Sequence, residues 1–171
     1  TSFLSKSLRN REAKKAIAQL ASNLVQDGDQ IFIGSGTTCF GMASYLRSKK
    51  GLSVIVNSVR TALELQSPGI DVLMLGGQYR PERMDTVGPL ASESLERLRG
   101  YRAFLGTDGI SQDFGLTSID IESASNVQNI ERKAIEELGM VYPRDDQYVE
   151  IAGQEPPGSD FALLLKEAAF N

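Results

Sequence analysis

Four short apolar segments, each followed at once by small or polar residues, constrain the fold of this 171-residue chain more than any other feature. The segments are 31–33, 52–56, 70–75 and 101–105, and stretches with helical spacing of apolar residues separate them. Strands that are mostly apolar are typical of a parallel sheet buried on both faces, and alternation of strand and helix is typical of the α/β class. The sequence therefore predicts an α/β domain whose mostly parallel sheet carries helices on both faces.

The helices between these strands are predicted from apolar residues that recur every three or four positions. A polar loop is expected from Tyr79 to Pro89, and residues 1–10 have the composition of a linker or an incoming arm. The residues expected to form the apolar helix faces are Ala13, Ile17, Leu20, Ala21 and Leu24, then Cys39, Met42, Ala43 and Leu46, then Val59, Ala62 and Leu63, and finally Ala91, Leu95 and Leu98.

The first apolar strand runs directly into the turn Gly34-Ser35-Gly36-Thr37-Thr38, and a helix follows. Glycine lets a backbone approach a ligand, and the first amides of a helix have no internal partner and favour anions. With three hydroxyls added, the turn has the chemistry of a neutral cradle for a phosphate or carboxylate. It lacks the lysine of a Walker A loop and the third glycine of a dinucleotide fingerprint, so a plain strand-to-helix connection with Thr as N-cap is the alternative.

Small or polar residues also follow the other three strands, and ligands bind at the carboxyl ends of strands in open α/β sheets. Asp108 is expected to project into the resulting crevice, with an Asx-turn as the alternative. Asn57 is either a ligand contact or a helix N-cap, and Arg80 and Arg83 either supply charge to a phosphate or are exposed loop arginines. The candidate ligand-binding residues at the strand ends are Ser35, Gly36, Thr37, Thr38, Asn57, Ser58, Gly76, Gly77, Arg80, Asp108 and Gly109.

Composition excludes several classes of site. The chain has no histidine, which rules out Ser-His-Asp catalysis and histidine-containing metal sites, and no metal or cofactor is expected. Its single cysteine, Cys39, cannot form an internal disulfide and is expected to be a small core residue. The net charge of −4 and the absence of a long apolar run or secretory signal predict a cytoplasmic protein that neither spans a membrane nor binds nucleic acid by this chain alone.

Residues 3–125 resemble the effector-binding domain of DeoR-type bacterial transcription repressors, whose fold is similar to ribose-5-phosphate isomerase and the CoA transferases. The resemblance covers about 70% of the chain. It is carried by a series of short motifs in order: 15–18 (Lys-Ala-Ile-Ala), 27–29 (Asp-Gly-Asp), 34–38 (Gly-Ser-Gly-Thr-Thr), 56–58 (Val-Asn-Ser), 75–80 (Leu-Gly-Gly-Gln-Tyr-Arg), 87–88 (Val-Gly), 104–110 (Phe-Leu-Gly-Thr-Asp-Gly-Ile) and 115–117 (Gly-Leu-Thr).

The resemblance implies that residues 35–38 hold the phosphate of a sugar phosphate and that Asp108 takes sugar hydroxyls. Glu122 lies where isomerase-like relatives keep an acidic residue. In that family the sugar phosphate relieves repression, the protein is expected to be a homo-oligomer, and DNA is bound by an N-terminal helix-turn-helix module. By that resemblance, residues 1–10 are the linker from a module absent from this chain, 11–126 the effector-binding domain and 127–171 a divergent C-terminal segment.

Besides the absent N-terminal module, the sequence departs from the family in a second respect, because the strand ending in Asp-x-Ser-Lys-Phe, with its ligand-facing lysine, is not found. A sugar-phosphate isomerase is the enzymatic alternative, with Asp108 and Glu122 as its carboxylates. It would also need a group such as lysine to stabilise an enediolate, and no lysine occurs between Lys50 and Lys133. A degenerate domain used only for oligomerisation is the remaining alternative, and a short amphipathic helix is expected after a hinge at 155–159.

Overall fold

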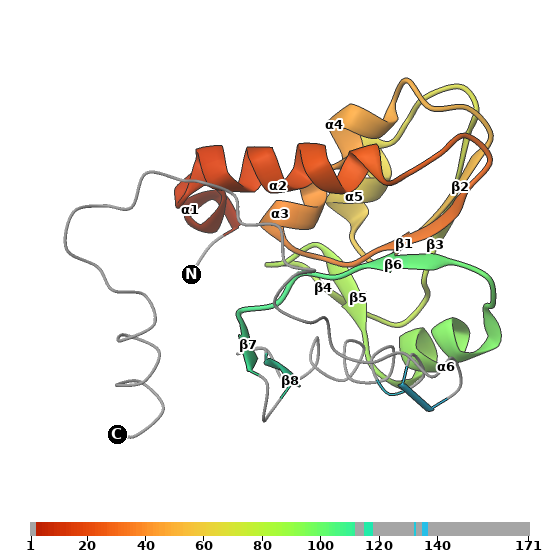
Figure 1. The fold of residues 1–171 in the computed structure, drawn as a ribbon. Helices are drawn as coiled ribbons and strands as arrows, with labels where there is room; N and C mark the ends of the chain where they lie inside the picture. The colour runs from red at the N-terminus through yellow and green to blue at the C-terminus, as the bar shows by residue number, and fades with distance from the viewer. Residues whose placement is uncertain (1–2, 112–114, 118–131, 133–134, 137–171) are drawn as a thin grey trace, which may run out of the picture.

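The computed structural model describes residues 3–111, 115–117, 132, 135 and 136 (Figure 1). A four-stranded parallel sheet forms its centre, and two short antiparallel hairpins, β4–β5 (residues 78–87) and β7–β8 (residues 109–111 with 115–117), are separate from it. The elements in chain order are α1 (Phe3–Leu8), α2 (Arg11–Asn23), β1 (Gln30–Ile33), α3 (Thr37–Phe40), α4 (Ala43–Leu46), β2 (Leu52–Val56), α5 (Val59–Glu64), β3 (Ile70–Met74), β4 (Gln78–Arg80), β5 (Asp85–Val87), α6 (Pro89–Arg97), β6 (Arg102–Phe104), β7 (Gly109–Ser111) and β8 (Gly115–Thr117).

The central sheet confirms the predicted class. Its strand order is β3-β2-β1-β6, and every pair is parallel. Because side chains alternate along a strand, Ile31 and Ile33 pack into a core with the helices α2 to α5, whereas Phe32 and Ile55 pack into a second core with Leu95 of α6. Figure 1 shows α6 on one side of the sheet and the earlier helices on the other. Helices therefore lie on both faces, as expected, although the middle of the edge strand β3, from Asp71 to Leu73, is exposed.

The buried face of α2 differs from the prediction. Ile17 and Leu20 were expected in the core, but they are 42% and 44% exposed. Ala18 and Ser22 are buried instead, because α2 packs closely on α3. A Cβ placed on Gly41 would lie only 3.1 Å from the Cβ of Ala18, so this contact accepts only small residues.

The helix after the first strand confirms its predicted apolar face but is divided in two. Cys39, Met42, Ala43 and Leu46 are all buried. The amides of Gly41 and Met42 donate to carbonyls three residues back, at 3.1 and 3.0 Å, which tightens the chain between α3 and α4. Cys39 is a core residue, as expected.

The loop expected between Tyr79 and Pro89 is in fact largely an antiparallel hairpin, formed by β4 and β5. Strand β5 is buried throughout, although two of its three residues are polar. The spacing of apolar residues did not predict this hairpin, because the burial of β5 depends on side-chain partners elsewhere in the fold. Asp85 pairs with Arg80, and Thr86 bonds to the ends of β2 and β3.

The N-terminal residues, predicted to be a linker or an incoming arm, include a short helix. Residues Phe3–Leu8 form α1, and the ring of Phe3 contacts that of Phe40 in α3, with 5.5 Å between the ring centroids. Within the described part of the chain, no helix is long and apolar enough to cross a membrane. The expected amphipathic helix and hinge in the C-terminal segment lie outside the described residues.

Candidate functional site

The turn after β1 places three hydroxyl groups around an open glycine. Gly36 has φ +143°, a conformation that favours glycine, and no atom lies within 4 Å of where its Cβ would be. Among the described residues, the side chains of Ser35, Thr37 and Thr38 make no hydrogen bond. Gly36 is the N-cap residue of α3 and supplies no side-chain cap. The predicted role of Thr as N-cap is therefore wrong, and the hydroxyls and first amides of α3 are left for other partners.

The turn after β6 lies beside the turn after β1. The amide of Gly34 donates to the carbonyl of Phe104 at 2.9 Å, and a Cβ on Gly106 would lie 3.9 Å from the carbonyl oxygen of Ser35. Asp108 is exposed in this second turn. The hydroxyl of Thr107 donates to the carbonyl of Gly109 at 2.7 Å, which ties the turn to the start of β7. The fold thus brings together two of the predicted clusters, Ser35 to Thr38 and Thr107 to Gly109.

The residues after β2 are buried and hold the next helix. Ser58 is the N-cap of α5, and its hydroxyl accepts from the amide of Thr61 at 3.4 Å. The N-cap role that was one prediction for Asn57 is therefore filled by Ser58. The side-chain amide of Asn57 donates to the carbonyl of Thr86 at 3.3 Å. Its Oδ1 atom is buried with no hydrogen-bond partner in the described structure, which is an unusual state for a buried acceptor.

The two glycines after β3 have different roles. Gly77 has φ +141°, and a Cβ there would lie 2.6 Å from the carbonyl oxygen of Val87. A glycine is required at this position because β5 passes against the backbone. Gly76 is exposed and has no atom within 4 Å of its Cβ position. Only Gly76 therefore leaves space at the end of β3.

Arg80 forms a buried ion pair with Asp85. Its Nε and Nη2 atoms donate to Oδ1 and Oδ2 of Asp85, both at 2.8 Å, and the two side chains are 11% and 1% exposed. The alternative of an exposed loop arginine is therefore wrong for Arg80. Arg83 is more exposed, and its Nε atom lies 4.0 Å from the same carboxylate. Two donors of Arg80 thus hold the β4–β5 hairpin, and its predicted contact with a ligand stays a prediction.

Sequence reasoning missed the two polar residues that join the strand ends. The amide of Thr86 donates to the carbonyl of Asn57 at 2.8 Å, and its hydroxyl donates to the carbonyl of Leu75 at 2.8 Å. Asp85 and Thr86 follow the Pro-Glu-Arg-Met segment that the sequence analysis assigned to a loop. The β-branched pair Thr86-Val87 was the one available signal of a strand, and it is short. Glu122 lies outside the described residues.

The arrangement suits recognition of a small polar molecule. Hydroxyls and amides at the end of β1 are donors for an anion, and the carboxylate of Asp108 in the adjacent turn is an acceptor for hydroxyl groups. Burial raises the pKa of the Cys39 thiol to about 11, so this side chain, whose sulfur lies 3.8 Å from the carbonyl oxygen of Phe104 at the end of β6, stays protonated at neutral pH. In the described residues there is no group of three or more histidine, cysteine, aspartate or glutamate side chains placed to hold a metal ion.

Comparison with known proteins gives the family. Residues 9–141 match the family described as the DeoR C terminal sensor domain. The lactose phosphotransferase system repressor of Lactococcus lactis subsp. lactis is 41% identical over 120 residues, which cover 68% of this chain and 47% of the relative. The HTH-type transcriptional repressor CsqR of Escherichia coli K12 is 30% identical over 131 residues, which cover 76% and 50%.

A third relative, the HTH-type transcriptional regulator GlpR of Haloferax volcanii, is 31% identical over 129 residues, covering 75% of this chain and 51% of the relative. The chain thus spans about half the length of these relatives. All three are named as transcriptional regulators, which agrees with the prediction of a regulator rather than an enzyme. The chain belongs to the DeoR C-terminal sensor domain family, and the four-stranded α/β sheet is the scaffold of a regulatory sensor domain.

Proposed function

We propose that this sensor domain binds a phosphorylated sugar or a related catabolite at the carboxyl ends of its parallel strands, and that binding relieves repression by the full-length regulator. The observation that carries the proposal is the turn after β1. There, the hydroxyls of Ser35, Thr37 and Thr38 make no hydrogen bond within the described structure and surround the open backbone of Gly36. Unsatisfied donors gathered at one turn are a ready site for a group with several acceptor oxygens.

A phosphate ester fits this turn by its chemistry. Its oxygens accept hydrogen bonds from hydroxyls and from the first amides of α3, and no side chain at Gly36 obstructs the approach. The turn itself is neutral, so it binds an anion through directed hydrogen bonds. Arg80 is assigned mainly to the hairpin, since two of its donors already bind Asp85.

The sugar would extend from this turn across the neighbouring strand ends. Asp108 lies in the turn after β6, beside the turn after β1, and a carboxylate accepts hydrogen bonds from sugar hydroxyls. Asn57 lies at the end of β2 on the other side of β1, with an unsatisfied Oδ1 atom. In the proposal, Gly76 and Gly109 leave room at the edges, and Ser58 and Gly77 shape the site through the backbone. Glu122, from outside the described residues, remains a proposed contact.

The name of one relative supports a role in control of carbohydrate genes. One is named for a lactose phosphotransferase system, and two are named as helix-turn-helix regulators. In the proposed mechanism the regulator is a cytoplasmic homo-oligomer that binds DNA through a helix-turn-helix module outside this chain. Ligand shifts the protein towards the state that binds DNA weakly, and it does so only by the difference in its affinity for the two states.

The test is a thermal-shift screen against phosphorylated sugars, with the same sugars lacking phosphate as controls. A ligand that binds only the folded state at about 100 times its Kd adds about 2.7 kcal/mol to the free energy of unfolding. We expect one class of phosphate ester to raise the melting temperature. Loss of one hydrogen bond to a charged oxygen should weaken its binding by about tenfold or more in Ser35→Ala and Thr37→Val.

Ser48→Ala is the matched control, because it also removes a hydroxyl that makes no hydrogen bond in the described structure. Ser48 is exposed, follows α4 and lies outside the four clusters at the strand ends. Asp108→Asn tests the sugar end, and it should reduce discrimination between sugars more than it reduces affinity for the phosphate. If no phosphate ester stabilises the protein, or if Ser35→Ala and Ser48→Ala weaken binding equally, the site is not where we place it. A folded oligomer without anion affinity would favour a domain used only for oligomerisation.

A further inference from the structure

The buried side-chain polar atoms that lack a hydrogen-bond partner in the described part of the chain all belong to one short segment. They are Oδ1 of Asn57, Nε of Arg60 and Oγ1 of Thr61, in the residues that lead from the end of β2 into α5. Buried polar groups in folded proteins are almost always paired. Their concentration at one strand end therefore points to a polar partner that binds there.

Arg60 carries the charge of this segment. Its guanidinium makes no ion pair and no hydrogen bond with the residues that the structure describes. The side chain is partly buried, and its Cζ atom lies 4.6 Å from the centre of the Phe3 ring. An aromatic face attracts a cation but provides no acceptor for the N–H donors of arginine. These donors are therefore available to a ligand.

Other arginines of the fold are paired with carboxylates. Arg80 binds Asp85 in a bidentate pair, and Arg47 binds Glu64 at the surface. Among the described residues, no carboxylate takes this role for Arg60. A partly buried charge without a counter-ion is unfavourable, and an anionic ligand would remove that cost.

Arg60 lies at the same edge of the sheet as the turn after β1. Strands β1 and β2 are parallel neighbours, so their carboxyl ends lie side by side. The ring of Phe3 contacts both Arg60 and Phe40, the last residue of α3. The amide of Phe40 donates to the carbonyl of Gly36 at 2.9 Å, so α3 is a single turn that begins at the proposed ligand site. Arg60 is thus connected to that site through one aromatic ring.

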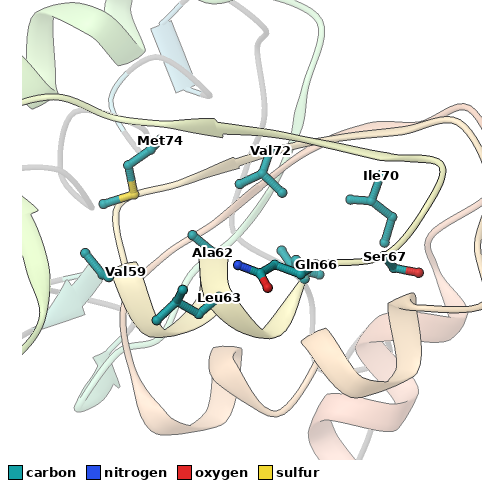
Figure 2. Close-up of a pocket in the computed structure, with 9 residues that line it drawn as sticks. Val59, Ala62, Leu63, Gln66, Ser67, Ile70, Val72 and Met74 are labelled. Carbon is teal, nitrogen blue, oxygen red and sulfur yellow. The ribbon is translucent and has the colours of Figure 1, made fainter.

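The pocket between α5 and β3 does not account for Arg60. Figure 2 shows Val59, Ala62 and Leu63 of α5 around this pocket, which has a volume of about 470 Å³. The residues that line it carry no charge, and neither Arg60 nor Thr61 is among them. Residues three and four apart share one face of a helix, so Arg60 lies on a different face of α5 from these three. Its charge is directed towards Phe3 instead.

We propose that Arg60 is a ligand contact, and that its guanidinium binds the phosphate group of the effector at the turn after β1. The inference rests on the proposed function, and it supplies the positive charge that the turn itself lacks. A guanidinium binds phosphate through paired N–H donors, which gives both affinity and a fixed orientation. Arg60 thereby selects a phosphorylated effector over the neutral sugar. Its movement onto the phosphate also opens the buried polar atoms of Asn57 and Thr61 to hydroxyl groups of the ligand.

The contact with Phe3 connects ligand binding to α1. A guanidinium that binds phosphate leaves the face of the Phe3 ring, so the ring loses this contact and keeps its edge contact with Phe40. Helix α1 contains no buried residue, so its position depends on a small set of contacts of this kind. Ligand binding should therefore loosen α1.

The first experiment measures binding of inorganic phosphate and of the phosphate esters of ribose, fructose and glycerol by thermal shift. We expect the Kd of the ester that binds to rise by about tenfold or more in Arg60→Gln. Arg60→Lys keeps the charge without the planar fork, so it should bind better than Arg60→Gln and less well than the unmodified chain. Circular dichroism checks that each variant is folded.

Arg97→Gln is the matched control, because it removes the same charge from an exposed arginine that has no partner in the described structure. Arg97 lies in the last turn of α6, on the opposite side of the sheet from α5 (Figure 1). Its substitution should leave the Kd unchanged, which separates a contact of Arg60 with the ligand from an effect of net charge.

A second measurement reports on the ring contact directly. The chain has no tryptophan, so Phe3→Trp places a single indole beside Arg60. Its fluorescence should change when the ester binds, and the change should be absent when Arg60→Gln is added. Leu8→Trp is the control on the same helix, and it should respond little because Leu8 is already 64% exposed.

The outcomes separate this inference from the proposed function. If an ester stabilises the unmodified chain but binds Arg60→Gln and Arg97→Gln equally, Arg60 is not a ligand contact, and the proposed ligand site stands without it. Fluorescence of Phe3→Trp that does not respond to a bound ester would overturn the inference in the same way. If neither inorganic phosphate nor any ester stabilises the unmodified chain, the proposed function fails and the inference fails with it.

Discussion

The ion pair between Arg80 and Asp85 should contribute strongly to stability, because it is buried and its geometry is bidentate. Both hydrogen bonds are 2.8 Å long, and Asp85 is 1% exposed. Asp85→Asn keeps the shape of the side chain and removes its charge. The guanidinium of Arg80 would then be left with a neutral partner in a site that is largely sealed from water.

Removing one partner of a buried ion pair destabilises a protein by about 3–5 kcal/mol, because the remaining charge stays desolvated without compensation. We expect a loss in this range for Asp85→Asn. The total free energy of unfolding of a domain is about 5–15 kcal/mol, so such a loss is readily measured. Arg80→Met with Asp85→Leu removes both charges, and the double variant should be more stable than Asp85→Asn alone.

The assay is urea unfolding followed by circular dichroism at one protein concentration. Glu64→Gln provides the matched control, because Glu64 pairs with Arg47 at the surface, where both side chains are well exposed. An exposed pair contributes about 0–1 kcal/mol, so the control should change the midpoint little. The two substitutions make the same chemical change in different surroundings.

Equal losses in Asp85→Asn and Glu64→Gln would refute the reasoning, since burial would then have no effect on the energy of the pair. A double variant less stable than Asp85→Asn would also refute it, because desolvation of the remaining charge could not be the cause.

Three further predictions concern packing and protonation. Gly77→Ala should destabilise the protein by about 2 kcal/mol or more in urea unfolding, because residue 77 has a positive φ and an added Cβ would collide with the carbonyl oxygen of Val87. Gly76→Ala should change stability by less than about 1 kcal/mol, because an added Cβ there meets no other atom. Ala18→Leu should cost about 1–3 kcal/mol by overpacking the contact with α3, and Leu20→Gln on the exposed face should have a smaller effect, which a comparison of melting temperatures checks. Cys39 should resist iodoacetamide at pH 8 until the protein unfolds. Its pKa in the folded state is about 11 and exceeds the value of 9.0 for a free thiol, so the free energy of unfolding should be intact below pH 9 and fall by up to about 3 kcal/mol as the pH rises to 11. The part of this fall that is due to Cys39 should be absent in Cys39→Ala.

The sequence was sufficient to predict the four strands of the central sheet and their common edge. Leu52–Val56 was placed correctly to the residue, because a short run between turn signals that is apolar apart from Ser53 has few other stable solutions in a soluble domain. The same argument placed the candidate ligand residues at the carboxyl ends of four strands, and the parallel order β3-β2-β1-β6 brings those ends to one edge of the sheet. Whether a ligand binds there remains the proposal that the thermal-shift screen tests.

Only the tertiary structure decided which small or polar residues are buried, because their burial depends on the residue they pack against. Spacing of apolar residues favoured Ile17 and Leu20 as the core face of α2, but the close approach of Gly41 admits only small side chains, so Ala18 is buried instead. Likewise, Asp85 is polar and was assigned to a loop, yet it is buried because Arg80 neutralises it across the hairpin. A single sequence records which residues prefer an apolar environment, but burial of a small or charged residue depends on a partner that only the folded chain supplies.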